Sequence, residues 1–140
     1  MTFASIIAPC LFLLLFAAAW FLLSYFFTSS FEDPSCSAKV TGTCGDTMEL
    51  QLKIKKGRIT ETYHWTDGCT TSRNCIESAA RLAHGKTPDY LKKITMWDII
   101  DDIGSLPESH VHCAQLAEIT LHQSLQDYLQ HQIPEKISQS

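Results

Sequence analysis

The chain has 140 residues, of which 45% are hydrophobic, and a formal net charge of −4. This length allows one ordinary domain, and the acidic balance argues against a nucleic-acid partner, because nucleic-acid binding needs a basic surface. All charged side chains lie in residues 32–140. We therefore expect an apolar membrane-anchor helix with the start of a linker over residues 1–31, and one domain with its own core over residues 32–140.

The apolar run from Ile6 to Phe27 is the first predicted element. As a helix it spans roughly 33 Å at about 1.5 Å per residue, which matches the hydrocarbon thickness of a bilayer. A cleaved signal peptide is the competing interpretation, but this run is too long for one and no Lys or Arg precedes it. Residues 6–27 therefore predict a retained single-pass membrane anchor, whose orientation the flanking charges do not set.

The domain is expected to begin with strands. Residues 28–37 form a short polar linker that includes Cys36, which we do not expect to be a ligand. Residues 38–43 predict a short strand. Apolar and polar side chains then alternate over residues 47–54, the period-two pattern of a strand with one buried face.

A hairpin is expected to follow this alternating strand. The segment Lys55-Lys56-Gly57-Arg58 has the glycine that tight hairpin turns require. On the return strand, we expect Ile59, Tyr63 and Trp65 to share the buried face. The charged turn itself is interpreted as a solvated hairpin.

Helical patterns follow the strands. Residues 71–84 predict a helix, Thr87-Pro88 a short helical turn, and residues 95–103 a helix capped by its first residue. The last helix is expected over residues 109–132, before Pro134, with apolar residues at spacings of three and four. The order predicts an α+β fold: a small antiparallel three-stranded sheet with helices packed on one face.

Three cysteines of the domain stand where a reduced thiolate is favoured. Cys44 lies in a glycine-bounded turn, and Cys69 and Cys113 lie at or just before predicted helix N-termini. Asp46 and His112, close to these cysteines in the sequence, can add an oxygen and a nitrogen ligand. Three thiolates with one weaker ligand suit an iron–sulfur cluster or zinc, so these five residues predict a metal or cluster site.

Other interpretations of these residues stay open. No CxxC pair marks a metal site, and a free cysteine is often only a small buried hydrophobe. Cys69 and His112 can also act as nucleophile and base, although nothing in the sequence marks an oxyanion hole. Cys75 is interpreted as a core or surface thiol.

The order of these elements resembles the NifU-like (IscU-type) family of iron–sulfur cluster assembly scaffolds over about residues 37–131. The segments that carry the resemblance are, in chain order, Cys44-Gly45-Asp46, the Gly57 hairpin, Asp67-Gly68-Cys69, Gly85-Lys86-Thr87, Leu106-Pro107, His112-Cys113 and a final helix reaching Asp127-Tyr128. The resemblance implies that Cys44, Cys69 and Cys113 hold the cluster. It also implies that Asp46 keeps the cluster labile and that His112 is auxiliary.

The resemblance further implies a scaffold without catalytic turnover. A cysteine desulfurase would deliver sulfur, iron would bind, and a transient [2Fe-2S] cluster would form and pass to apo iron–sulfur proteins. The alternative is a zinc-binding structural or regulatory module of the same fold. Because sulfur donor, iron and reduced thiols are cytoplasmic, the domain is expected to face the cytoplasm. Whether it forms a homodimer is left open.

Overall fold

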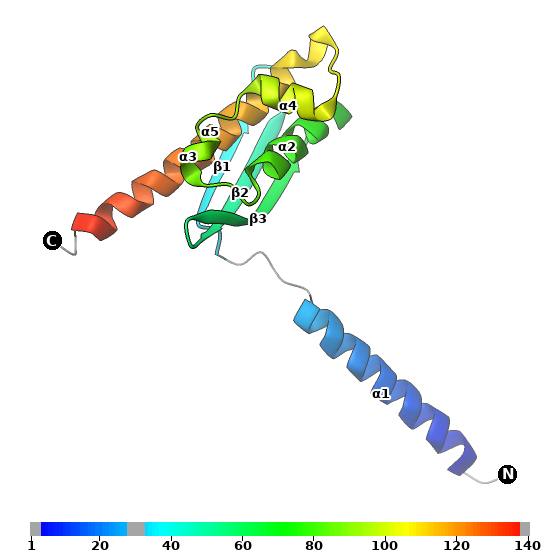
Figure 1. Ribbon diagram of the computed structural model, residues 1–140. Coiled ribbons are helices and arrows are strands. Elements are labelled where there is room, and N and C mark those ends of the chain that lie inside the picture. The colour runs from blue at the N-terminus through cyan, green and yellow to red at the C-terminus, as the bar shows by residue number, and fades with distance from the viewer. Residues whose placement is uncertain (1–3, 28–32, 138–140) are drawn as a thin grey trace. The chain divides into compact units, whose positions relative to one another are not determined.

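The computed structural model describes residues 4–27 and 33–137, and the chain divides into two units, residues 1–32 and 33–140 (Figure 1). The first unit contains one helix, α1 (Ala4–Phe27). Its stretch Ile7–Phe26 is long and apolar enough to cross a membrane by length and composition, a property that N-terminal signal sequences share.

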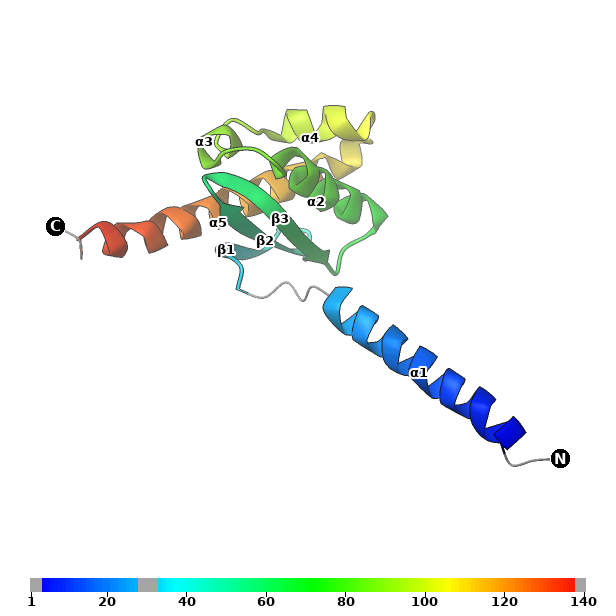
Figure 2. The same cartoon turned by 60° about the horizontal axis from the view of Figure 1, so that its bottom comes forward.

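The second unit has the predicted α+β fold. Strands β1 (Cys36–Thr41), β2 (Thr47–Lys55) and β3 (Arg58–Thr66) form one antiparallel sheet in the order β1-β2-β3. The helices α2, α3 and α4 lie on one side of this sheet (Figure 2). The helical elements are α2 (Thr70–Ala83), α3 (Pro88–Leu91), α4 (Met96–Ile103), the 3-10 turn η1 (Glu108–His110) and α5 (Val111–Ile137).

The core lies between the sheet and the two long helices of the domain. Met48, Leu50 and Leu52, the alternating residues of β2, are completely buried. They belong to one cluster with small and apolar side chains of α2 and α5, namely Cys75, Ile76, Ala79, Ala80, Ala83, Ala114, Leu116, Ala117, Leu121 and Leu125. Burying each leucine contributes about 1.5–3 kcal/mol, and the alanines allow the helices to approach the sheet closely.

The hairpin between β2 and β3 confirms the prediction for this turn. Lys56 and Gly57 both have positive φ, 53° and 73°, as the two central residues of a type I′ turn require. The register then shifts, because Ile54 pairs with Ile59 while Lys53 pairs with Glu61. One extra residue is therefore inserted in β3, which makes a β-bulge.

This bulge makes one expectation wrong. Ile59 is buried, but Tyr63 and Trp65 are 43% and 42% exposed. Side chains alternate between the two faces of a strand, so one inserted residue moves every later side chain to the other face. His64, opposite the buried Leu50, lies on the helix-covered face instead.

The boundaries of β1 and α5 also differ from expectation. Cys36 is not in the linker: it opens β1, pairs with Leu52 and is 3% exposed. β1 therefore begins and ends two residues earlier than expected. The expectation that the last helix ends before Pro134 is wrong, because α5 continues to Ile137. Proline removes one backbone hydrogen bond and crowds the carbonyl four residues earlier, which can kink a helix without ending it.

The short helix α4 is capped as predicted and held against α2. The Thr95 hydroxyl and backbone N–H both donate to Asp98, at 2.8 and 2.7 Å. On α2, the buried Ser78 hydroxyl donates to Asp102 Oδ2 of α4 at 2.6 Å, and Arg81 pairs with the same carboxylate. These polar contacts hold α4 against α2.

Candidate metal or cluster site

The turn between β1 and β2 positions the first site residue. The Gly42 N–H donates to the Asp46 carbonyl at 2.8 Å and the Gly45 N–H donates to the Gly42 carbonyl at 3.0 Å. Asp46 therefore sits directly before β2. Asp67 ties this turn to the segment before α2, because its Oδ1 accepts a hydrogen bond from the Thr47 N–H at 2.6 Å.

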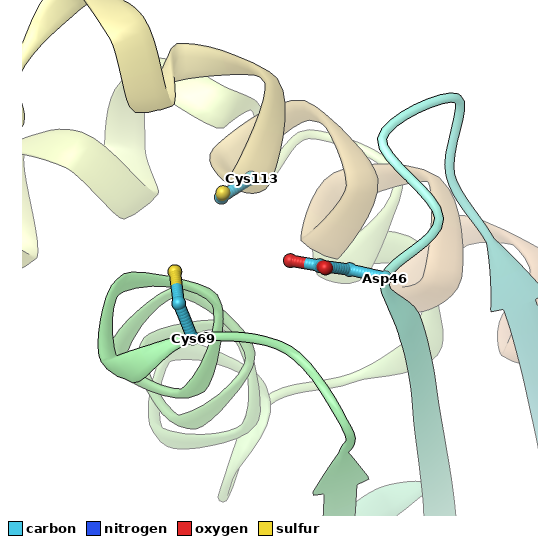
Figure 3. Close-up of side chains that lie close together, drawn as sticks. All are labelled: Asp46, Cys69 and Cys113. Carbon is cyan, nitrogen blue, oxygen red and sulfur yellow. The ribbon is translucent and has the colours of Figure 1, made fainter.

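Three predicted ligands come together at this end of the sheet. Asp46 lies at the start of β2, Cys69 is the N-cap of α2, and Cys113 lies in the first turn of α5. One oxygen and two sulfur atoms of these residues lie within 4.8 Å of one another, and the side chains point toward each other (Figure 3). Sulfur ligands of one tetrahedral metal lie about 3.8 Å apart, so the separation of these atoms is close to that of ligands of a single metal.

The two thiols of this group have opposite environments. Cys69 is exposed, and the pKa of its thiol is lowered, first by the backbone N–H of Ser72 and then by the Ser72 hydroxyl, although the geometry falls short of a full cap hydrogen bond. Cys113 is 1% exposed, and burial raises the pKa of its thiol. The Ser72 hydroxyl opposes this rise, while the charges of Cys69, Cys44 and Asp46 add to it. Cys69 is therefore the thiol that ionises more readily.

Gly68 allows these residues to approach closely. A Cβ atom at this position would lie 2.5 Å from Asp46 Oδ2 and 2.7 Å from the Ser72 Cβ. Both distances are shorter than side chains tolerate, so only glycine fits between the β3 end, Asp46 and α2.

Ser72 is a site residue to which the sequence analysis assigned no function. Its hydroxyl donates to Asp46 Oδ2 at 2.6 Å and lies 3.3 Å from Cys113 Sγ and 3.6 Å from Cys69 Sγ. The available signal was its position: Ser72 is four residues before Ile76 and lies on the same buried face of α2. A polar side chain on an apolar stripe needs a polar partner.

Cys44 and His112 lie beside the group that the described residues form, not in it. Both line a hollow of about 250 Å³, together with Val40, Leu116 and Ile119. Cys44 is exposed on its turn. Consecutive residues of a helix point about 100° apart, which separates His112 from Cys113, and the ring of His112 stacks on that of His110 with centroids 6.2 Å apart.

Cys75 belongs to the core. It is completely buried on α2, and burial raises the pKa of its thiol to about 12. All six cysteines are free thiols.

Most of the chain matches one protein-family model, which shows the family of this domain. Residues 29–135 match the family model described as NifU-like N terminal domain. The chain belongs to this family. The resemblance stated from the sequence is thereby confirmed.

Relatives in this family are named for cluster assembly. The chain is 34% identical over 85 residues to "Iron-sulfur cluster assembly scaffold protein IscU 1" of Archaeoglobus fulgidus, covering 61% of this chain and 56% of the relative. It is 31% identical over 91 residues to the IscU scaffold protein of Aquifex aeolicus, covering 64% and 58%. The chain thus spans about half the length of the curated relatives it matches.

Solved structures agree on the fold. An N-terminal NifU-like protein from Brucella abortus superposes with a TM-score of 0.55 at 20% identity, covering 70% of this chain and 81% of that one. A scaffold candidate of the SUF system from Fervidobacterium islandicum gives 0.56 at 19% identity, covering 71% and 86%. The predicted fold class of the NifU-like domain is therefore confirmed.

Proposed function

We propose that residues 32–140 are an iron–sulfur cluster assembly scaffold that binds iron and a transient [2Fe-2S] cluster as its cargo. The observation that carries this proposal is the convergence of Asp46, Cys69 and Cys113 at one end of the sheet in a NifU-like domain. Thiolates are the usual ligands of iron in such clusters. The two thiols and the carboxylate fit this role because they are close without being joined by a disulfide.

Cys44 is proposed as the third thiol ligand and His112 as an auxiliary ligand. Cys44 lies on the turn that ends at Asp46, and its charge contributes to the raised pKa of Cys113, so the two thiols lie within electrostatic reach. We expect a change in this short turn to bring Cys44 to the cluster. Asp46 supplies a hard oxygen ligand that binds iron more weakly than a thiolate, so the cargo stays exchangeable.

The proposed partners follow from the cargo. A cysteine desulfurase delivers sulfur as a persulfide to a scaffold cysteine, a separate electron donor reduces it to sulfide, and apo iron–sulfur proteins receive the finished cluster. The chain itself does not turn over a substrate as an enzyme does.

We also propose that α1 anchors the domain in a membrane, with the domain in the cytoplasm. The support is the length and apolar character of Ile7–Phe26. The linker enters the domain at Cys36, whereas the site turn follows Thr41 at the other end of β1. Six strand residues extend roughly 20 Å, so the attachment point does not obstruct the site. Labelling that places the C-terminus outside the cytoplasm would contradict the orientation.

The decisive experiment is anaerobic reconstitution of the full chain in detergent with iron, cysteine and a cysteine desulfurase. We expect visible charge-transfer absorption with nearly equal iron and sulfide. We also expect Cys44→Ser, Cys69→Ser and Cys113→Ser each to abolish this absorption. If only Cys69→Ser abolishes an activity of the protein, a thiol enzyme replaces the scaffold interpretation.

A zinc-binding module is the second candidate function, because two thiols and a carboxylate are also a zinc donor set. A purified protein that holds one zinc ion, stays colourless and takes up no cluster would favour it. Both candidate functions use the same residues. They differ in whether these residues hold a transient iron–sulfur cluster or a zinc ion.

A further inference from the structure

The Ser72 hydroxyl lies among all three converging side chains. Its oxygen is 2.6 Å from Asp46 Oδ2, 3.3 Å from Cys113 Sγ and 3.6 Å from Cys69 Sγ. Ser72 itself is completely buried, so bulk water does not reach its side chain. One hydroxyl group thus lies close to the carboxylate oxygen and to both sulfur atoms that converge at this site.

The hydroxyl carries one proton and can donate it to one acceptor at a time. In the metal-free protein it donates to the Asp46 carboxylate, which is the shortest contact, and such charge-assisted bonds are stronger than neutral ones. Its direction is fixed by the helix, because Ser72 lies on the first turn of α2, three residues after Cys69. Gly68 closes the other side, where a Cβ would collide with Asp46 and Ser72.

We propose that Ser72 is a positioning residue of this site. In the metal-free protein it holds the Asp46 carboxylate beside the two thiols. When a metal binds Asp46 and the thiolates, the same hydroxyl turns its proton to Cys113 Sγ. This inference rests on the proposed function of the site as a metal or cluster scaffold.

Two measurable consequences follow for a variant without the hydroxyl. Loss of a hydrogen-bonding partner behind a metal ligand typically weakens metal binding by about 10–100-fold. A hydrogen bond to a ligand sulfur also withdraws electron density from it and influences the properties of the bound metal. Its loss should shift the sulfur-to-metal charge-transfer band to lower energy, an effect that a loss of stability alone does not produce.

α2 provides a matched control in Ser78. Ser78 is also completely buried, and its hydroxyl donates to a carboxylate, Asp102 Oδ2, at the same distance of 2.6 Å. It serves the contact between α2 and α4 and not the cysteines. Ser78→Ala therefore removes an equivalent hydrogen bond from the same helix without touching the site.

The test is a titration of full-length Ser72→Ala, Ser78→Ala and the parent chain with Co²⁺ in detergent, under reducing anaerobic conditions, followed by displacement with Zn²⁺. We expect Ser72→Ala to bind both ions 10–100-fold more weakly, with its charge-transfer band at lower energy. Ser78→Ala should unfold at lower temperature but keep the parent affinity and band. In an Asp46→Ala background, the effect of Ser72→Ala on affinity should shrink, because part of it acts through Asp46.

The outcomes separate the two proposals. A Ser72→Ala variant with parent affinity and parent spectrum would overturn the role of Ser72 and leave the metal site intact. The same follows if Ser78→Ala weakens binding equally, because the effect would then be general destabilisation. A parent chain that binds neither metal nor cluster would overturn the proposed function itself.

Discussion

Each end of the sheet carries a tight turn and polar contacts that are buried or half-buried. The two ends differ in the side chains that surround the turn. At the hairpin end, the turn at Lys56-Gly57 is exposed, and the nearby Cys36 is sealed in the core. At the other end, the turn before Asp46 is hydrogen-bonded to itself and lies beside an exposed thiol, Cys69. The hairpin needs only a permissive backbone, whereas the site end needs specific side chains at specific distances.

The largest expected difference between the ends is the reactivity of their thiols. At pH 8, more than about 10% of a thiol is ionised if its pKa lies below 9, against about 0.01% for a pKa near 12. The pKa of Cys69 is lowered from 9.0, and burial raises that of Cys36 to about 12. Iodoacetamide should therefore modify metal-free Cys69 at least about 30-fold faster than Cys36, because the larger ionised fraction outweighs the greater intrinsic nucleophilicity of a thiolate with a higher pKa. Peptide mass spectrometry over time measures both rates in one sample.

Equal modification rates at Cys69 and Cys36 would contradict the expected difference between the two ends of the sheet. Cys75, buried on α2 with its thiol pKa also raised to about 12, is the internal control and should react as slowly as Cys36. Rapid modification of Cys75 would mean that the core opens during the experiment.

Packing at the site end should tolerate much less change than the hairpin. Gly68→Ala places a methyl group 2.5 Å from Asp46 Oδ2 and 2.7 Å from the Ser72 Cβ, so the carboxylate or the first turn of α2 must shift. We expect metal affinity to fall by about 10–100-fold, as for loss of a supporting contact, and stability to fall by about 1–3 kcal/mol from overpacking. Co²⁺ titration and urea unfolding measure the two effects separately. Unchanged affinity would show that Asp46 is not held in place at this point.

The sequence predicted the elements better than it predicted the faces of the strands. The alternation along β2, the hairpin glycine and the caps of the helices follow from local chemistry, and the structure has them. Tyr63 and Trp65 were assigned to the wrong face because the bulge in β3 has no marker residue such as glycine or proline. Cys36 was misplaced because a single cysteine at a strand boundary does not reveal its burial.

The candidate site also combines features that the sequence predicts with features that only tertiary packing creates. The sequence pointed to Cys44, Asp46, Cys69, His112 and Cys113, of which Asp46, Cys69 and Cys113 lie far apart along the chain but meet in space. Ser72 was given no role, because its importance comes from three distances that only the packing of α2 against β2 and α5 creates. Residue type and order can suggest ligands, but the groups that orient them depend on tertiary contacts.

A smaller effect is expected at alkaline pH from the thiol at the hairpin end. Burial raises the pKa of Cys36 from 9.0 to about 12, so the unfolded chain loses this proton first as pH rises. The stability associated with the protonated thiol is complete below pH 9 and is lost between pH 9 and 12. The slope is about 1.4 kcal/mol per pH unit. Urea unfolding of the parent chain and of Cys36→Ala between pH 8 and pH ~10.5 should differ by this slope above pH ~9, and parallel curves would contradict the burial of the thiol.

The smallest effect is expected in the hairpin turn itself. Gly57 has φ of 73°, which costs a residue with a Cβ about 1–2 kcal/mol. Gly57→Ala should lower the free energy of unfolding by that amount. Lys56→Gly should raise it, because Lys56 already occupies the same unfavourable region with φ of 53°. Neither variant should change Co²⁺ affinity, since an added Cβ at Gly57 meets no atom within 4 Å. If either variant weakened metal binding, the two ends of the sheet would be coupled through β2, and the hairpin would have to be counted as part of the site.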